Sequence, residues 1–379
     1  MRPAAQAWER DYTKKLEETG FKRGRSAPTV FFDEKTQVRG VVHGDDFTFL
    51  GYDEELDMVT KHMQEWYLLK VRARVGPDAM DSKEVIILNK KLEWKHNGIT
   101  FEADDKHAKI LCKELGLDAG SRGLDAPIVK ETKSDMDDED MQELLGKEDA
   151  TKFRALAARA NYLAQDRMDI QYTTKEICRD MANPRKSSFG KLKRLARYLV
   201  EHPTMEMFYK EMNVEHANII DVYSDSDWAG CLRTRRSTSG GVVTIAGGAI
   251  KTWSTTQSTV ALSSGEAEYY ALTKAAAEGL GVQSLAFDLG WNMKVRIWVD
   301  STAAKAIASR TGLGRVRHLE VRYLWVQDAL KDGKFMVVKV RGDLNPADVL
   351  TKPHSVNDMA EMLRVVNTKV TNRGVGLGT

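Results

Sequence analysis

Four short acidic phrases in the last third of the chain constrain its fold more than any other feature. They lie at residues 223–227 (YSDSD), 265–269 (GEAEY), 298–301 (WVDS) and 345–348 (NPAD). Each contains an acid where a predicted strand ends or a predicted helix begins, so the acids can meet if the fold brings these ends together. Converging carboxylates repel one another unless cations neutralise them, and a pair of hard divalent cations can position a phosphodiester for hydrolysis. The pattern therefore predicts a metal-dependent nuclease.

Two of the phrases contain competing acids. Asp225 closes the strand predicted for residues 219–224, and it is a better candidate ligand than Asp227, because the residues that follow indicate that the strand ends there. The second phrase overlaps a capping box, in which Glu266 accepts a hydrogen bond from the amide of Ser263. Glu268 has no such structural role in its stretch of Ala and Tyr, so we expect it to be the ligand.

The other two phrases contain one candidate each. Asp300 ends the apolar strand predicted for residues 295–299. Asp348 falls in the first turn of a short helix that Asn345 caps. A favourable interaction with the helix dipole would alone account for Asp348, but its place after the strand predicted for residues 335–340 favours a role in the site.

Composition narrows the class of protein. A chain of 379 residues predicts two or three domains. The net charge of +2 means that any nucleic-acid binding must come from local basic patches. Three widely spaced cysteines without a CxxC pair favour a reducing compartment and argue against a zinc site or a disulfide framework. No apolar run reaches transmembrane length and no secretory signal is evident, so we expect a soluble intracellular protein without a membrane partner.

Apolar periodicity predicts a mixture of helices and strands. Residues 43–46 form the tip of one hairpin, and a second hairpin joins a strand at 85–94 to one at 99–102. Residues 118–150 are acidic and poorly patterned, which indicates a surface loop. The predicted secondary structure changes from helices to short strands near residue 219. Helices are predicted at residues 5–20, 53–69, 103–117, 152–165, 169–182, 187–201, 264–282, 302–309 and 319–331, and further strands at 241–245 and 249–254.

Several sequence phrases resemble one family. Residues 223–230 (YSDSDWAG), 235–240 (RRSTSG), 257–264 (QSTVALSS) and 347–352 (ADVLTK) are similar to the ribonuclease H domain of copia-type retrotransposon Pol polyproteins. Upstream, residues 20–23 and the hairpin acids resemble the second half of a reverse transcriptase palm, and residues 192–199 resemble the connecting region. The resemblance implies an α/β (α+β) fold, in which a truncated palm and connection precede a ribonuclease H-like mixed sheet flanked by helices.

The resemblance also implies an activity and its site. It is the hydrolysis of the RNA strand of an RNA–DNA hybrid with two Mg²⁺ ions, which Mn²⁺ can replace. The implied catalytic and metal-binding acids are Asp225, Glu268, Asp300 and Asp348. Ribonucleases H outside this group often have a His before the last acid, but residues 340–345 contain none. His318 is the nearest alternative, and we expect it to be structural.

The same resemblance divides the chain and suggests its surroundings. Expected partners are an RNA–DNA hybrid and the missing reverse transcriptase segments or the integrase of the same polyprotein. The expected location is cytoplasmic, in a virus-like particle, or nuclear. The expected domains are a partial palm and thumb-side region at 1–117, an acidic linker at 118–150, a helical connection at 151–215, a ribonuclease H-like domain at 216–356 and a tail at 357–379.

The hairpin tip departs from the family pattern. Family members usually read YVDD where residues 43–46 read HGDD, so the acids Asp45 and Asp46 are present in a changed context. A polymerase also needs an Asp at the end of an earlier strand, and neither Asp11 nor Asp33 follows a suitable apolar strand. With the fingers and first palm strand missing as well, we expect no polymerase activity from this chain alone.

Two basic segments are candidate nucleic-acid contacts. Arg194 and Arg197 belong to the predicted helix at 187–201, although a solvated basic helix face is an equally good reading. Arg235 and Arg236 lie close to Asp225 in sequence. Two readings compete with the hybrid-specific nuclease: a catalytically inactive retroelement relic that at most binds nucleic acid, and a nuclease that takes another substrate such as duplex DNA.

Overall fold

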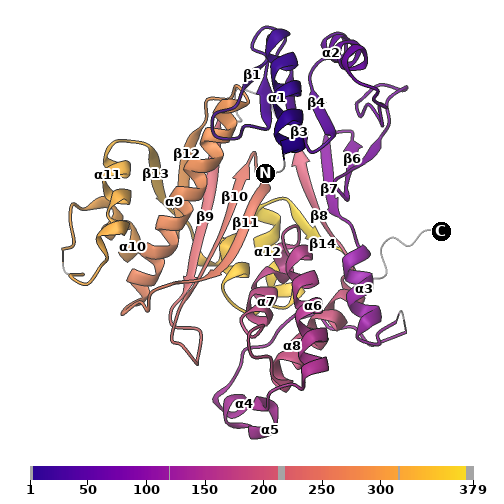
Figure 1. Ribbon diagram of the computed structural model, residues 1–379. Coiled ribbons are helices and arrows are strands. Elements are labelled where there is room, and N and C mark those ends of the chain that lie inside the picture. The colour runs from indigo at the N-terminus through magenta and orange to yellow at the C-terminus, as the bar shows by residue number, and fades with distance from the viewer. Residues whose placement is uncertain (1–2, 119, 212–217, 315, 373–379) are drawn as a thin grey trace. The chain divides into compact units, whose positions relative to one another are not determined.

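The computed structural model describes residues 3–118, 120–211, 218–314 and 316–372 (Figure 1). The chain forms two compact units. Unit 1 comprises residues 1–74 and 280–294, and unit 2 comprises residues 75–279 and 295–379. Within the described ranges, every helix is too short or too polar to cross a membrane.

Unit 1 is a small antiparallel sheet with two helices. The strand order is β1-β2-β3-β4, and alternate residues of the central strands enter an aromatic core with Tyr12, Leu16 and Phe31. Gly40 leaves room for Phe49 on the neighbouring strand, since a Cβ there would lie 2.8 Å from that ring. The elements are α1 (Pro3–Glu18), β1 (Lys22–Arg23), β2 (Val30–Phe32), β3 (Arg39–His43), β4 (Asp46–Leu50) and α2 (Asp53–Trp66).

Unit 2 contains an antiparallel five-stranded sheet with the order β14-β8-β7-β6-β5. The single strand predicted at residues 85–94 was wrong, because the chain turns back at Leu88 and Asn89, whose φ angles are 51° and 61°. Asn89 is a residue type that readily adopts this left-handed conformation, but a leucine rarely does, so the pair carries only a weak turn signal. The strands are β5 (Glu84–Ile87), β6 (Lys90–Lys95), β7 (Gly98–Ala103), β8 (Met205–Lys210) and β14 (Thr368–Val370).

Helices between these strands form a bundle with its own apolar core. Phe153, Ile170, Ile177 and Leu195 are fully buried in it. The predicted acidic loop contains two short, fully solvated helices with side-chain caps at Thr132 and Asp138. The helices are α3 (Lys106–Glu114), α4 (Lys133–Asp137), α5 (Glu139–Gln142), α6 (Lys147–Leu163), α7 (Met168–Cys178) and α8 (Lys186–Glu201).

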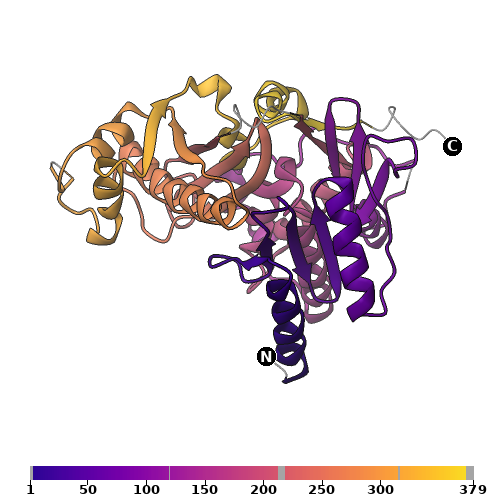
Figure 2. The ribbon, with the colours of Figure 1, turned by 90° about the horizontal axis from the view of Figure 1, so that it is seen from above.

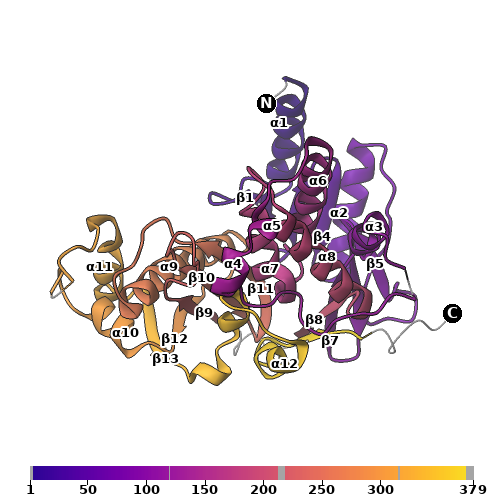
Figure 3. The same cartoon turned by 90° about the horizontal axis from the view of Figure 1, so that it is seen from below.

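The second sheet of unit 2 has the order β11-β10-β9-β12-β13, with β9, β10 and β11 antiparallel and β12 parallel to β13. Figures 2 and 3 show α9 and α12 on opposite faces of this sheet. Gly279 brings α9 close to Val222 and Val295, while Leu363 of α12 packs in the cluster that contains Val242. The elements are β9 (Ile219–Asp227), β10 (Thr238–Ile245), β11 (Gly248–Thr256), α9 (Ser264–Asp288), β12 (Lys294–Val299), α10 (Thr302–Ser309), η2 (Val321–Tyr323), α11 (Trp325–Lys331), β13 (Phe335–Lys339), η3 (Gly342–Leu344), η4 (Pro346–Leu350) and α12 (Val356–Val365).

The predicted fold class, a mixed α/β (α+β) chain with a sheet flanked by helices, is confirmed. The expected domain bounds stay a prediction. The two compact units meet in sequence at residue 74, and β7 pairs with β8, which follows the helical bundle in sequence. Residues 357–370 of the expected tail are folded as well, since Met359 and Leu363 are buried and β14 pairs with β8.

A buried ion pair holds the bundle to the strand that follows it. Arg167, whose exposed fraction is 1%, donates two hydrogen bonds to Asp169, at 2.9 and 2.7 Å. It also donates to the carbonyl oxygens of His202 and Pro203 at the end of α8, and the Tyr198 hydroxyl donates to Asp169. Every polar group of the pair thus has a partner, which a buried pair needs in order to offset its lost hydration.

We expect the substitution Asp169→Asn to lower the free energy of unfolding by about 3–5 kcal/mol, because it leaves the Arg167 guanidinium buried without its counter-charge. Chemical denaturation followed by circular dichroism measures this change. The control is Arg364→Ala, which removes an exposed pair with Glu361 and should cost less than about 1 kcal/mol. Equal effects of the two substitutions would contradict a special role for the buried pair.

Candidate metal centre and nucleic-acid interface

Asp225 lies within β9, two residues before its end, so the prediction that the strand ends at Asp225 was wrong: Ser226 and Asp227 continue the pairing with β10. Its backbone pairs with Gly240 of β10, and its side chain accepts a hydrogen bond from the hydroxyl of Thr351. The amide of Asn345 donates to the carbonyl of Ser224 at 3.0 Å, so the segment that contains Asp348 is tied directly to β9. A glycine is needed at position 240 because a Cβ there would meet Thr351 and η4 at 2.7–2.9 Å.

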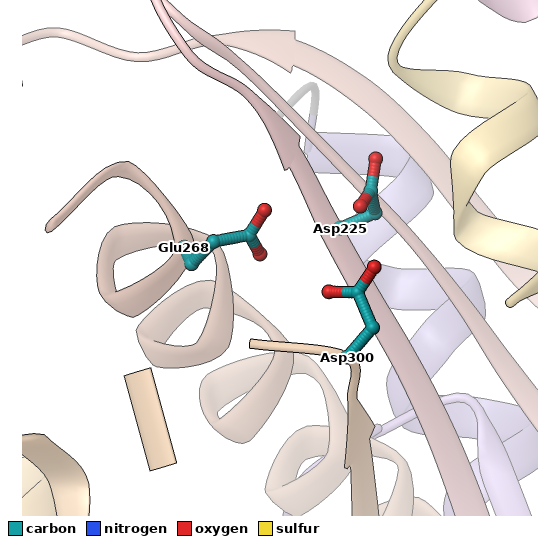
Figure 4. A group of neighbouring side chains, drawn as sticks. All are labelled: Asp225, Glu268 and Asp300. Atoms are coloured by element: carbon teal, nitrogen blue, oxygen red, sulfur yellow. The ribbon is translucent and has the colours of Figure 1, made fainter. Parts of the chain in front are cut away.

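Glu268 and Asp300 approach the same point from two other elements. Glu268 projects from the second turn of α9, and its Oε1 accepts a hydrogen bond from the Ser226 amide at 3.3 Å. Asp300 directly follows β12. One carboxylate oxygen each of Asp225, Glu268 and Asp300 lies within 4.8 Å of the others (Figure 4). We call these three residues the acid group.

The acid group is electrostatically strained in the absence of a cation. Burial, and then the charge of Asp348, raises the pKa of Asp225 to about 7. Burial, followed by the charges of Asp225 and Asp300, raises the pKa of Glu268 to about 9. Burial and Asp348 also raise the pKa of Asp300. The shared direction of these shifts means that the site favours bound positive charge, whether protons or metal ions.

Asp348 lies beside the acid group but outside it. Its carboxylate forms an ion pair with Lys352, and the Nε2 atom of His354 lies 3.1 Å from its Oδ2. Burial would raise the pKa of Asp348, but the contacts with His354 and Lys352 outweigh burial and lower it. Asp348 therefore acts on Asp225 and Asp300 through its charge in this arrangement. Sequence reasoning missed His354 because it sought a histidine before the last acid and not after it.

The residues of the acid group fit a hard divalent cation. Their ligand atoms are all carboxylate oxygens, which Mg²⁺ and Mn²⁺ accept. The Oε2 atom of Glu268 is buried and has no hydrogen-bond partner in the described part of the chain. A buried carboxylate oxygen without a partner is costly, and a cation would supply the missing interaction.

The two acids passed over by the sequence analysis have structural partners. Glu266 is buried and accepts hydrogen bonds from the Tyr270 hydroxyl at 2.6 Å and from the Leu262 amide at 2.9 Å. The capping bond is therefore made to Leu262 and not to Ser263. His318 Nε2 lies 2.7 Å from the same carboxylate, which places this histidine against Glu266 and not in the acid group. Asp227 accepts a hydrogen bond from the Thr238 amide.

The tip of the hairpin formed by β3 and β4 in unit 1 is engaged by other residues. Asp46 forms an ion pair with Arg72 at 2.9 Å, and the carbonyl of Gly44 accepts a hydrogen bond from the Trp8 indole at 2.8 Å. Asp45 is exposed. The described part of unit 1 brings no third acid to this pair, since the metal-type cluster of the described residues is the acid group.

The four arginines predicted to contact nucleic acid differ in whether their side chains already bond to other parts of the protein. Arg194 donates to the carbonyl of Ala126 at 3.2 Å, and Arg197 donates to that of Arg122 at 3.1 Å, so both fasten the 122–126 segment to α8. Arg235 and Arg236 are exposed on the loop that follows β9, and neither guanidinium forms an ion pair within the described ranges. The loop pair is thus better placed than the helix pair to receive a phosphate.

Comparison with known proteins gives several Pol polyproteins of plant transposons among the relatives. No protein-family model matches the chain. It is 32% identical over 188 residues, 49% of its length, to the retrovirus-related Pol polyprotein from transposon TNT 1-94 of Nicotiana tabacum. It is 31% identical over 210 residues, 55% of its length, to that from transposon RE1 of Arabidopsis thaliana. Each match covers 14% of the relative, so the chain aligns with a small part of these polyproteins.

Solved structures give partial likenesses. A crystal structure of LC11-RNase H1 in complex with RNA/DNA hybrid matches 35% of this chain and 93% of its own, with 20% identity and a TM-score of 0.24. The foamy viral protease-reverse transcriptase in complex with RNA/DNA hybrid matches 80% of this chain and 36% of its own, with 11% identity and a TM-score of 0.44.

The mixed sheet with its flanking helices and the Pol relatives together agree with a segment of a retroelement Pol polyprotein. The relatives named here are thus Pol polyproteins of plant transposons, and the chain is about 30% identical to them over about half of its own length.

We expect the stability of the metal-free protein to fall as the pH rises from about 5.5 to 8.5. The pKa values of Asp225 and Glu268 are raised from 3.8 and 4.5 to about 7 and about 9, so the folded state holds protons that the unfolded state has lost. That contribution is complete below about pH 4 and disappears as the pH passes the folded-state values. Thermal unfolding in a chelator measures the decline.

Addition of Mg²⁺ should reverse this decline, and should raise the melting temperature more at pH 8.5 than at pH 5.5, because protons compete for the same oxygens. The Asp300→Asn variant removes one repelling charge, so its metal-free stability should depend less on pH. An Mg²⁺ response that is equal at both pH values, or unchanged in this variant, would contradict a cation site at the acid group.

Proposed function

We propose that the chain is a metal-dependent ribonuclease H that cleaves the RNA strand of an RNA–DNA hybrid. The observation that carries the proposal is the acid group: three carboxylates from β9, α9 and the end of β12 meet within 4.8 Å with unrelieved mutual repulsion. The family relationship supports the choice of substrate, since these relatives are retrovirus-related Pol polyproteins.

Each residue has a distinct part in this proposal. Asp225, Glu268 and Asp300 would hold the metal. Asp348 would become a fourth ligand once its ion pair with Lys352 breaks. Bound divalent ions would supply Lewis-acid stabilisation of the phosphate and activation of water. Thr351 fixes the Asp225 carboxylate by its hydrogen bond, and the bond from Asn345 to the Ser224 carbonyl holds the Asp348 segment in reach. Lys352 and His354 balance the charge of Asp348.

Asp300→Asn should reduce the rate of hybrid cleavage by about 100-fold or more, because metal stabilisation of the transition state contributes several kcal/mol and each 1.36 kcal/mol is a factor of ten. The assay uses a labelled RNA–DNA hybrid with Mg²⁺, and compares it with RNA–RNA and DNA–DNA duplexes of the same sequence. Asp332→Asn is the matched control, since Asp332 is an exposed acid after α11 in the same unit, and its activity should equal that of the parent.

The three substrates separate the competing functions. Cleavage of duplex DNA at the rate of the hybrid would replace hybrid specificity by a general nuclease activity. Mg²⁺-dependent binding without cleavage by the parent would favour the inactive relic. Equal cleavage by the parent and by Asp300→Asn would assign the activity to a contaminant or to another site.

We also propose that Arg235 and Arg236 contact phosphates of the hybrid. Each phosphate contact releases condensed counterions, so the slope of log affinity against log salt scales with the number of contacts. The double substitution Arg235→Gln/Arg236→Gln should weaken binding and reduce the size of that slope by the amount expected for about two lost contacts. Arg194→Gln/Arg197→Gln is the comparison pair. Because those side chains bond to backbone carbonyls, this second pair should lower the melting temperature and leave the salt slope nearly unchanged. The reverse pattern would move the interface to α8.

The wider assignments follow from the family and stand as proposals. The chain alone would not polymerise DNA, and other segments of a Pol polyprotein or its integrase would be its protein partners. Its place of action would be intracellular, in a cytoplasmic particle or in the nucleus.

A further inference from the structure

An exposed apolar surface lies directly beside the acid group. Trp228, three residues after Asp225, is 52% exposed, and its indole Nε1 donates a hydrogen bond to the carbonyl of Ala261 at 3.1 Å. Val260 and Leu262, which flank Ala261, are 42% and 65% exposed. Single exposed apolar side chains are ordinary, but an exposed tryptophan hydrogen-bonded to a segment with two further exposed apolar side chains indicates a binding surface. We call Trp228 and Leu262 the platform.

The loop that carries Trp228 is held rigidly. Ala229 has a φ of 54°, a left-handed conformation that costs free energy for a residue with a Cβ. Its amide donates to the buried Ser237 hydroxyl at 2.9 Å, which fixes the conformation. Gly230 packs so closely on the carboxylate of Asp227 that a Cβ at that position would collide with it. Strain retained beside a site is a reason to seek a function, and here it fixes the orientation of the Trp228 ring.

The same loop supplies positive charge. Arg233 is used internally, since it pairs with Asp180 at 3.1 Å. Arg235 and Arg236 lie at the tight turn that Cys231 closes with two backbone hydrogen bonds, at 2.8 and 3.2 Å, and both side chains are exposed. An exposed aromatic side chain in the same loop as two guanidinium groups that form no ion pair within the described ranges suits a ligand with flat rings and negative charges, which is the combination that single strands and hybrids of nucleic acid present.

The sequence separation between Trp228 and Asp225 limits which part of a bound strand Trp228 can contact. Three residues of extended backbone span at most about 10 Å, so the backbone of Trp228 lies no farther than about 10 Å from that of Asp225. Successive phosphates of a strand are about 3.4 Å apart along the helix axis. The platform therefore lies within about three nucleotides of a phosphodiester held at the acid group.

We propose that the platform stacks against a sugar or base of the nucleic-acid strand, within about three nucleotides of the cleaved phosphodiester, while Arg235 and Arg236 hold neighbouring phosphates. The position relative to cleavage rests on the proposed nuclease function, whereas the stacking itself does not. Trp228 is thus a substrate-positioning residue, in a loop whose sequence follows the first metal-binding acid.

The test measures hybrid affinity in the cleavage-deficient Asp300→Asn background, by fluorescence anisotropy of a labelled RNA–DNA hybrid. Trp228→Leu should weaken binding by about tenfold, within the range found for loss of one stacking contact, and Trp228→Phe should retain most of the affinity. Neither variant should change the salt slope, because stacking releases no counterions. Phe287→Ala, which removes an aromatic side chain that is 72% exposed elsewhere on α9, should bind like the parent.

A second readout locates the contact. Hybrids that carry 5-iodouracil at single positions are irradiated with the parent protein, and the crosslinked peptide is identified by mass spectrometry. Crosslinks to the peptide that contains Trp228, from positions within about three nucleotides of the cut, are expected. Equal affinities of the Trp228→Leu and Trp228→Phe variants would overturn the proposal, and so would crosslinks confined to other peptides.

The nuclease proposal and the platform proposal can each be refuted without refuting the other. A parent protein that binds the hybrid through Trp228 without cleaving it would refute the nuclease and leave the platform standing. A parent that cleaves the hybrid, and whose Trp228→Leu variant binds and cleaves normally, would refute the platform alone. A lower melting temperature in both variants with unaltered affinity would assign Trp228 to stability, against the proposal.

Discussion

Repulsion between the carboxylates of the acid group is the constraint that the rest of unit 2 has to overcome. Asp225, Glu268 and Asp300 come from three elements that are 32 or more positions apart in sequence, and burial raises their pKa values as they meet. Such an arrangement is unfavourable by itself, so it requires a scaffold that is stable for other reasons. The apolar contacts of α9 and α12 on the two faces of the sheet supply that stability.

Polar bonds around the acids hold them in place without neutralising them. Asn345 and Thr351 bond to Ser224 and Asp225, and Glu266 uses its carboxylate to tie the start of α9 to His318. The two glutamates of the EAE phrase thus have different tasks, although they are only two positions apart. One is saturated with hydrogen bonds, while Oε2 of the other has no partner within the described ranges. That difference in bonding separates a structural carboxylate from one available for a ligand.

The sequence predicted the order of the elements around the site, but not every boundary: Asp300 directly follows β12 as expected, whereas β9 continues two residues beyond Asp225. Asp225, Glu268 and Asp300 were recognised from local pattern, and the structure brings these three together. The role of His354 could not be predicted, since it depends on how the chain turns after η4. The turn at Leu88 and the strands β8 and β14 were missed for a related reason: tertiary pairing determines them, and their residues lack clear turn or strand signals. Likewise, the hydrogen bonds of Arg194 and Arg197 depend on a segment about 70 residues away.

The closing strand β14 has a consequence for how this protein is divided into fragments. Motif similarity ends near residue 352, which invites truncation there, but Thr368–Val370 pairs with β8 and Met359, Met362 and Leu363 fill the apolar layer beneath Val242. A fragment that stops at the last motif would expose the unpaired backbone of β8 together with this apolar layer, and exposed strand edges of that kind promote self-association. A fragment designed around the acids should therefore include α12 and β14.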